Sequence, residues 1–129
     1  MNTEEIIQYV KEHPSGKVKI AFADIDGVLR GKYASSEKFL SVIKSGSGFC
    51  DVIFGWDTAD VAYDNVKYTG WHTGYPDAPA QIDLNTFRKI PWEGGVPFFL
   101  GDLADQKGQP AYVCPRQVLE KVGAEAERA

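Results

Sequence analysis

The sequence of 129 residues has little of what marks several classes of protein. No apolar run approaches the roughly 18 residues that a membrane-spanning helix needs. Basic residues number 14 against 18 acidic ones, and this balance argues against a nucleic-acid surface, which needs a basic stripe. The acidic start, from Met1 to Glu5, has neither the basic nor the apolar segment of a signal peptide. We therefore expect a cytoplasmic protein that binds neither a membrane nor nucleic acid.

Cysteine is also scarce. Cys50 and Cys114 belong to no Cys-x-x-Cys pair and to no Cys/His cluster, so we expect no structural zinc. We expect both cysteines to be reduced thiols. The remaining composition, 43% hydrophobic and 25% charged, is that of an ordinary globular protein and excludes disorder. The length is suited to one domain with a real core.

The order of apolar and polar residues predicts a mixture of helices and strands. Helices are expected to begin at the capping pair Asn2 and Glu5, at Ser36, and at Pro115. Strands are expected over residues 17–25, 28–35, 49–54, 81–90, 96–103 and 109–113. Residues 55–79 show no sustained period, and so they predict a loop well beyond the usual length.

The first two predicted strands flank the dipeptide Asp26-Gly27, which is a strong signal for a hairpin turn. The stretch from Asp24 to Leu29 also resembles the first motif of haloacid-dehalogenase-like phosphatases, in which one Asp attacks phosphorus and another acts as acid and base beside Mg²⁺. That family has a parallel sheet with helical crossovers, whose strands are apolar throughout. The first strand here alternates apolar residues with lysines, which is typical of a strand with one face exposed to water. A small magnesium-dependent phosphatase that uses Asp24 and Asp26 therefore stays as an alternative to a hairpin turn.

An ordered series of segments resembles the N-terminal β-grasp domain of glutamine synthetases and their relatives. The segments are residues 22–32, 49–57, 75–84, 88–92, 98–102 and 114–119, and together the series covers 17–122. The resemblance implies an α+β fold, a β-grasp-like and mostly antiparallel sheet with one or two packed helices. It divides the chain into an N-terminal β-grasp domain, 1–113, and the start of a helix, 114–129, that leads into a C-terminal catalytic domain missing from this chain.

The resemblance also implies an activity. The family makes γ-glutamyl phosphate from glutamate and ATP, and ammonia or an amine then attacks it. ATP and Mg²⁺ or Mn²⁺ are expected in the missing catalytic domain, so we expect no cofactor and no metal on this fragment, and no activity from it alone. The expected partners are the catalytic domains of its own and neighbouring subunits, in a homo-oligomeric ring.

Asp57 is the residue that the resemblance assigns to ammonium binding, in an acidic loop that enters the active site of the neighbouring subunit. A carboxylate favours an ammonium ion and can accept its proton. The family's loop commonly reads Asp-Gly-Ser-Ser, whereas this one reads Asp57-Thr58-Ala59-Asp60, so Asp60 stands where a serine is expected. We predict Asp57 as the catalytic residue, with Asp57 and Asp60 binding the substrate, and the choice between ammonia and a larger amine stays open.

The long loop also carries aromatic side chains. Because the loop is acidic, a protein interface is a better interpretation than a platform for a nucleotide. The predicted interface residues are Trp56, Tyr63, Trp71 and Tyr75. A stand-alone β-grasp interaction module, which recognises a partner through this loop, is the alternative without chemistry. His72 is expected to pack in the interface, and Arg30 and Lys32 are expected to be surface charges.

Overall fold

The fold begins its sheet with the hairpin that the sequence predicts. In the computed structural model, which describes residues 1–129, β1 (Lys17–Ala23) pairs antiparallel with β2 (Leu29–Ser35). The turn between them contains Asp26 and Gly27, and Gly27 has a φ of 79°. Glycine adopts this conformation at no steric penalty because it has no Cβ.

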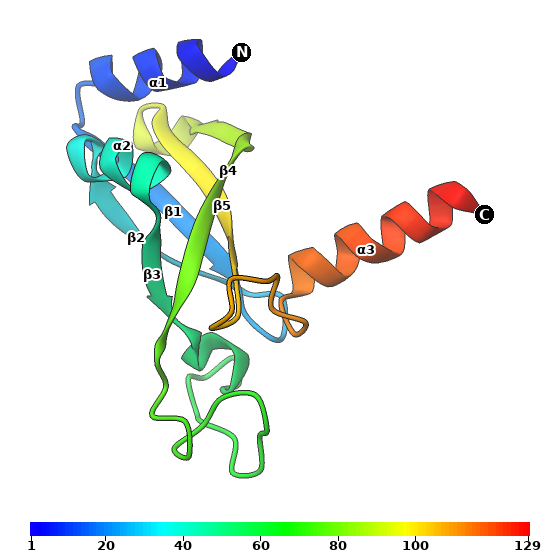
Figure 1. The fold of residues 1–129 in the computed structure, drawn as a ribbon. Coiled ribbons are helices and arrows are strands. Elements are labelled where there is room, and N and C mark those ends of the chain that lie inside the picture. Colours follow the sequence, from blue (N-terminus) through cyan, green and yellow to red (C-terminus); the bar gives the residue numbers. More distant parts are fainter.

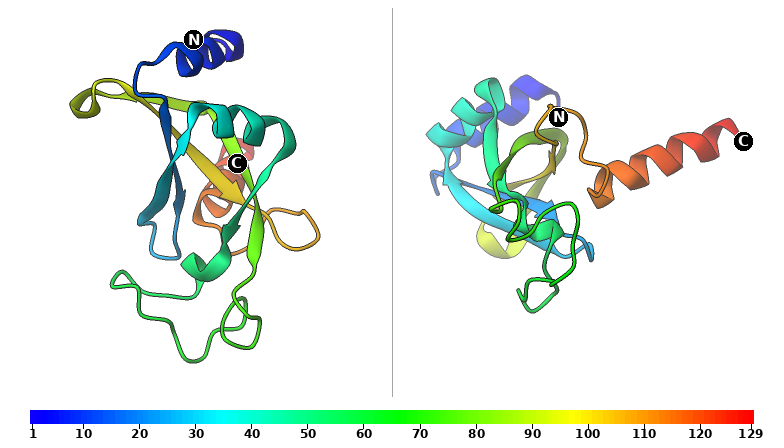
Figure 2. Two further views of the ribbon diagram at one scale, coloured as in Figure 1. Left: turned by 90° about the vertical axis from the view of Figure 1, so that its left-hand side faces the viewer. Right: turned by 60° about the horizontal axis from the view of Figure 1, so that its bottom comes forward.

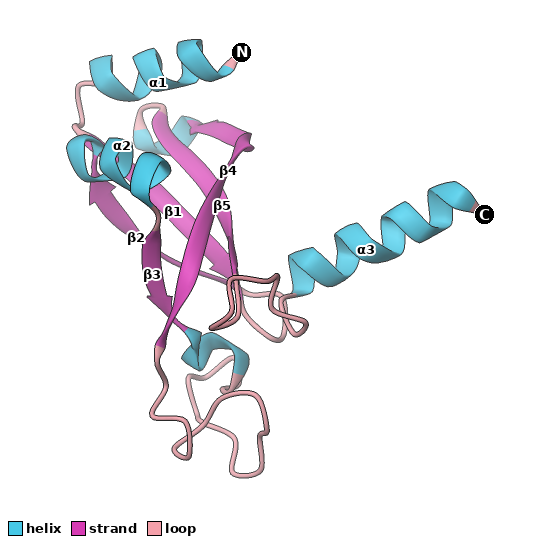
Figure 3. Cartoon of the chain, viewed as in Figure 1, coloured by secondary structure: helices cyan, strands magenta, loops and turns pink.

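Three more strands complete a five-stranded sheet with the order β2-β1-β5-β4-β3. The central β5 (Val96–Leu103) runs parallel to β1, and β4 (Asp77–Ile90) pairs antiparallel with both β5 and β3 (Ser47–Cys50). The short 3-10 helix η2 (Pro91–Glu93) links β4 to β5. The predicted α+β fold with a mostly antiparallel, β-grasp-like sheet is confirmed, and Figure 3 shows its sheet and helices in separate colours.

Two helices pack near one end of the sheet, as Figures 1 and 2 show. α1 (Thr3–Glu12) begins at the predicted capping box, in which the Asn2 side chain accepts from the Glu5 N–H and the Glu5 carboxylate accepts from the Asn2 N–H. α2 (Ser36–Ser45) is capped by Ser35, one residue before the predicted Ser36. The rings of Phe39 from α2 and Phe99 from β5 stack at 4.6 Å in the core.

The core is apolar and lies between these helices and the sheet. Its fully buried members include Val10 of α1, Val18 of β1 and Phe99 of β5. Burial of such side chains is the main stabilising contribution to a domain of this size.

Two predicted strands are wrong. Over 49–54, β3 ends at Cys50, and the 3-10 helix η1 (Asp51–Phe54) follows, because the neighbours Ile53 and Phe54 are both buried, whereas a strand would point them to opposite faces. Over 109–113 the chain makes an isolated bridge between Ala104 and Pro110 but no strand. Pro110 has no N–H to donate to a ladder of hydrogen bonds.

α3 (Pro115–Arg128) begins at Pro115 as predicted and projects away from the sheet (Figure 1). None of its residues is buried, and its apolar Val118, Leu119 and Val122 are exposed. Arg116 ties the first turn of α3 to the sheet through Asp83 and Asp102. No helix in the structure has both the length and the apolar character to span a membrane.

The segment from residue 55 to residue 76 contains no strand or helix and hangs from the end of the sheet away from α1, at the bottom of Figure 1. Its base is fixed by a buried contact in which the Thr69 hydroxyl donates to the carboxylate of Asp51. The ring of Tyr68 packs edge-on against Phe54 at 5.9 Å. The long unpatterned stretch is therefore attached to the core at its base while its outer part reaches into solvent.

Candidate functional site

Three turns share one hydrogen-bond pattern, and we call them the Asp turns: residues 24–28, 57–61 and 105–109. In each, the N–H of the first residue, an aspartate, donates to the carbonyl of the fifth, and the N–H of the fourth donates to the carbonyl of the first. The aspartate Oδ1 accepts from the N–H groups of the third and fifth residues at 2.8–3.0 Å. The fourth residue, which has a positive φ, is Gly27, Asp60 or Gly108.

The first Asp turn closes the β1–β2 hairpin, and both carboxylate oxygens of its aspartate accept hydrogen bonds within the chain. Asp24 is completely buried; its Oδ1 serves the turn, and its Oδ2 accepts from Arg30 Nε at 2.9 Å. A phosphatase nucleophile must face its substrate, and this carboxylate faces the interior. The antiparallel pairing of β1 and β2 also differs from a parallel sheet with helical crossovers. The structure thus gives no support to a phosphatase that uses Asp24 and Asp26.

The second Asp turn holds the predicted site residue Asp57. A bridge between Trp56 and Ala62 flanks this turn. Asp57 is half-buried, and its Oδ1 accepts from Ala59 and Val61 at 2.8 and 3.0 Å, while its Oδ2 accepts no hydrogen bond within the chain. One carboxylate oxygen of Asp57 therefore remains available to a cation.

Asp60, the other predicted substrate ligand, lies in the same turn but is already paired. It is exposed, has a φ of 63°, and forms an ion pair with Arg30 Nη1. Asp60 therefore has an ion-pair partner within the chain, which it shares with Asp24, whereas Asp57 has none.

Arg30 lies between the first and second Asp turns and contacts both. Besides Asp24 and Asp60, it donates from Nη2 to the carbonyl oxygen of Asp57 at 3.2 Å, and its guanidinium lies 5.0 Å from the ring centroid of Trp56. Its side chain is only 17% exposed, so the prediction of a surface charge is wrong for Arg30. Hydrogen bonds to Asp24 and then to Asp60 raise its pKa. No local pattern pairs Arg30 with Asp60, because 30 residues separate them.

The predicted interface aromatics fall into different environments. Trp56 is half-buried against Arg30, whereas Trp71 is 84% exposed and meets Tyr75 edge-on at 5.2 Å. Tyr63 is exposed at the margin of the Asp turns, where partial burial and the charges of Asp26 and Asp57 raise the pKa of its hydroxyl. Trp71 and Tyr63 are thus the exposed members of the four, whereas Trp56 and Tyr75 are half-buried.

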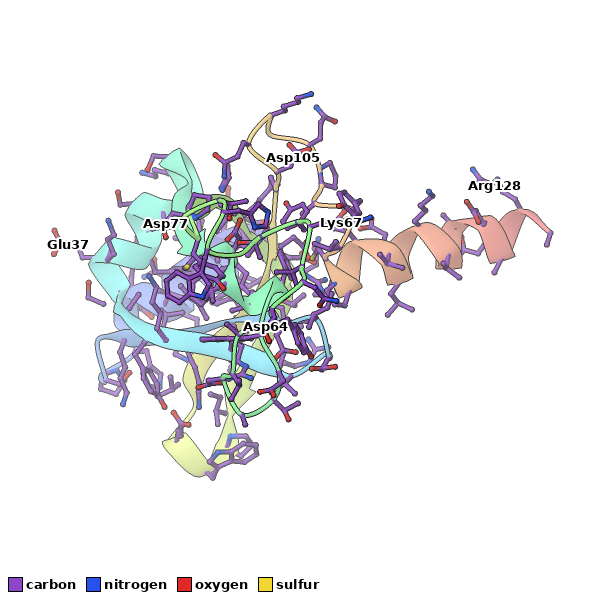
Figure 4. The ribbon with its side chains drawn as sticks, turned by 90° about the horizontal axis from the view of Figure 1, so that it is seen from below. Glu37, Asp64, Lys67, Asp77, Asp105 and Arg128 are labelled. Carbon is purple, nitrogen blue, oxygen red and sulfur yellow. The ribbon has the colours of Figure 1, made fainter.

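Two further polar residues lie in or beside the acidic segment, by which we mean residues 55–76: His72 within it and Asp51 just before it. His72 is exposed, and its Nε2 lies 3.2 Å from the carbonyl oxygen of Lys67. Asp51 is buried without a cation, and burial raises the pKa of its carboxyl. Figure 4 shows this end of the molecule, with Asp64, Lys67 and Asp77 labelled. No periodic pattern in the sequence indicates the structural role of Asp51, whose buried carboxylate accepts the hydrogen bond from Thr69.

Metal binding finds no support among these side chains. No three His, Cys, Asp or Glu residues are grouped so that they could hold a metal ion. Cys50 and Cys114 are free thiols, as predicted. What the site offers is one uncommitted carboxylate oxygen on a turn fixed by an arginine, which suits a small organic cation better than a divalent metal ion, because the latter takes several oxygen ligands.

Comparison with known proteins finds homologues over nearly the whole chain. No family model matches the sequence. The chain is, however, 58% identical over 123 residues to type-1 glutamine synthetase 2 of Dictyostelium discoideum, a match that covers 95% of this chain and 24% of that protein. It is 34% identical over 131 residues to a glutamate–isopropylamine ligase of Pseudomonas sp, covering 98% of this chain and 28% of the ligase. These homologues, which match nearly the whole chain, are members of the glutamine synthetase family.

Other relatives extend the comparison to a further amide-forming enzyme. The chain is 30% identical over 122 residues to a γ-glutamylethanolamide synthetase of Streptomyces coelicolor, covering 94% of this chain and 26% of that enzyme. The chain thus spans about a quarter of the length of these curated relatives.

Solved structures confirm the fold. Ligand-free GmaS superposes with a TM-score of 0.68 at 22% identity, over 93% of this chain and 25% of GmaS. Glutamine synthetase of Plasmodium falciparum superposes with a TM-score of 0.63 at 19% identity, over 94% of this chain and 22% of that one. The resemblance that the ordered segments of the sequence indicate is therefore confirmed, both in sequence and in fold.

Proposed function

We propose that this chain is the N-terminal domain of an ATP-dependent ligase that joins ammonia or an amine to the γ-carboxyl group of glutamate. The observation that carries the proposal is the match, over nearly the whole chain, to a glutamine synthetase, to a ligase named for the amine isopropylamine and to a synthetase named for its ethanolamide product. Because these relatives are ligases, the stand-alone interaction module is not favoured.

In this proposal the chain contributes one group to the chemistry, the carboxylate of Asp57. Its free Oδ2 would accept a hydrogen bond from the ammonium form of the substrate and then take its proton, which leaves the neutral amine as the nucleophile. The segment around it extends away from the core (Figure 1), a position suited to entering the active site of a neighbouring subunit.

The rest of the machinery belongs to other parts of the proposed enzyme. Residues 1–113 would form the N-terminal domain, and 114–129 would begin the helix that leads into the catalytic domain, where ATP and Mg²⁺ or Mn²⁺ would bind. The apolar side chains that α3 exposes support a packing partner for this helix. Contacts with the catalytic domains of its own and neighbouring subunits would assemble a homo-oligomeric ring, and the proposed interface residues are Trp56, Tyr63, Trp71 and Tyr75.

The experiment separates amine use from activation of glutamate in the full-length enzyme. In Asp57→Ala we expect amide formation with ammonium, isopropylamine or ethanolamine to fall roughly 100-fold or more, the scale of a lost general base. ADP release driven by glutamate without amine, which reports γ-glutamyl phosphate formation, should change little. Asp64→Ala, which removes an exposed acid from the same segment, should leave both rates near the wild-type values.

Two results would contradict the role of Asp57. One is an equal loss of both rates, which indicates a general structural defect. The other is no loss of either rate. A wild-type enzyme that forms no amide with any of the three amines, although it releases ADP with glutamate, would contradict the proposed reaction itself.

A further inference from the structure

Arg30 is the one cation that joins the rigid sheet to the acidic segment. It lies on β2, and its Nε is fixed by the fully buried Asp24. From there the two other nitrogens reach the second Asp turn, one to Asp60 and one to the carbonyl of Asp57. A planar guanidinium with five donors can make these bonds together, which an ammonium group cannot do in the same geometry.

These contacts give Asp24 and Asp60 an ion-pair partner and leave the carboxylate of Asp57 without one. The single guanidinium of Arg30 binds the carboxylates of Asp24 and Asp60, but it contacts only the backbone carbonyl of Asp57. The Oδ1 of Asp57 is used by its own turn. The Oδ2 of Asp57 therefore accepts no hydrogen bond within the chain, whereas Asp24 and Asp60 share one guanidinium, and this oxygen suits a singly charged ammonium or primary alkylammonium ion.

The conformation of Asp60 supports this division. Residues other than glycine are strained at a positive φ, and glycine occupies the equivalent position of the other two Asp turns. In the second turn the position holds an aspartate whose side chain reaches Arg30. The ion pair gives this side chain a function that glycine could not supply.

We infer that Arg30 is a positioning residue for the amine nucleophile. It holds the turn of Asp57 against the sheet, and it pairs with Asp60, so that Asp57 is the carboxylate of this turn without an ion-pair partner. This inference rests on the proposed role of Asp57 and goes beyond it, because it names the residue that places that carboxylate.

The test uses the full-length enzyme and two variants that break the link from opposite ends. Arg30→Lys keeps the charge but loses the simultaneous contacts, and Asp60→Gly removes the ion pair while it favours the positive φ of the turn. In both we expect the KM for the amine to rise roughly tenfold, the scale of a lost charged hydrogen bond, while the KM values for glutamate and ATP stay within about twofold.

The matched control is Lys32→Gln, two residues along the same strand. Lys32 lies over the ring of Phe49 and contacts no residue of the second Asp turn, so its loss should leave all three KM values unchanged. Thermal unfolding of each variant shows whether the fold is retained. Since Asp60 is exposed, Asp60→Gly keeps the test valid even if Arg30→Lys unfolds.

The possible outcomes are distinct. An amine KM that rises alone in Asp60→Gly, and in Arg30→Lys if it folds, supports the inference. An amine KM within twofold of wild type in Asp60→Gly overturns it, while the role of Asp57 stands if Asp57→Ala still fails with amines. Equal effects on all substrates indicate a structural role and also overturn it. If Asp57→Ala has no amine-specific effect, the proposed role of Asp57 fails, and this inference fails with it.

Discussion

The first and second Asp turns have the same backbone and opposite surroundings. Both use Oδ1 of the leading aspartate to bind two N–H groups, and both place a residue of positive φ fourth. Asp24 is completely buried and gives its second oxygen to Arg30, whereas Asp57 keeps its second oxygen free. The pair teaches that a local motif fixes the shape of a turn, while neighbouring elements decide whether its carboxylate is structural or free to bind.

The third Asp turn, at Asp105, serves as the reference. It has the same Oδ1 hydrogen bonds, to Lys107 and Gln109, but no arginine beside it. A free carboxylate oxygen on such a turn is therefore not a site by itself. What distinguishes the second turn is that Arg30 anchors it to the sheet.

The largest expected difference between the first two turns is in stability. Asp24→Ala removes three hydrogen bonds to a buried carboxylate and leaves Arg30 without its buried partner, so we expect a loss of about 3 kcal/mol in the free energy of unfolding. Asp57→Ala should lose only about 1 kcal/mol, because water can reach the exposed N–H groups of its turn. Urea unfolding of the chain measures both, and equal losses would contradict the comparison.

A smaller difference is expected at the fourth position of each turn. Gly27 has a φ of 79°, and a Cβ at this position would have no atom within 4 Å, so Gly27→Ala meets only backbone strain and should destabilise by roughly 1–2 kcal/mol. Asp60→Gly relieves strain and loses an exposed ion pair, and these effects should offset to within about 0.5 kcal/mol. Gly16→Ala, at a φ of 62° and also in open space, is the control for strain outside an Asp turn. A loss in Asp60→Gly as large as in Gly27→Ala would contradict this account.

The smallest expected effect concerns Asp51, a buried carboxylate that has no arginine partner, unlike Asp24. Asp51 has the hydroxyl of Thr69 but no cation, and burial raises its pKa. A raised folded-state pKa stabilises the fold below the unfolded-state pKa, and this contribution is lost as the pH rises through the folded-state pKa. Asp51→Asn should therefore equal or exceed the wild type in stability at pH 7, with a smaller advantage near pH 4.

Unfolding of Asp51→Asn and the wild type at both pH values measures this difference. The lowered pKa of Asp83, caused by its hydrogen bond to Arg116, acts in the opposite direction but is common to both proteins and cancels. Asp83→Asn serves as the control of opposite sign, since its loss should be larger at pH 7 than in acid. A lower stability of Asp51→Asn at pH 7 would show that the charged carboxylate is required.

Local signals predicted much of the fold. The capping box at Asn2, the Asp26-Gly27 turn, the apolar strand from Val96 to Leu103 and the proline start of α3 at Pro115 are each encoded within a few residues. The prediction failed where long-range burial decided the conformation, as at η1, where Ile53 and Phe54 both enter the core.

The candidate site was predictable only in part. The resemblance indicated Asp57 by its place in an ordered series, and that role remains a prediction. Its free oxygen, the pairing of Asp60 and the burial of Trp56 against Arg30 could not be derived in this way, because each depends on contact between segments far apart in the chain.

The sequence by itself indicated the resemblance to glutamine synthetases, the α+β class and the acidic loop, because ordered motifs and local turn chemistry can be recognised without knowledge of contacts. Only the tertiary structure decided which charges are balanced. Arg30 reaches Asp24 across its own hairpin and Asp60 across 30 residues, and Coulomb attraction and burial act on distance in space, which the order of residues does not specify.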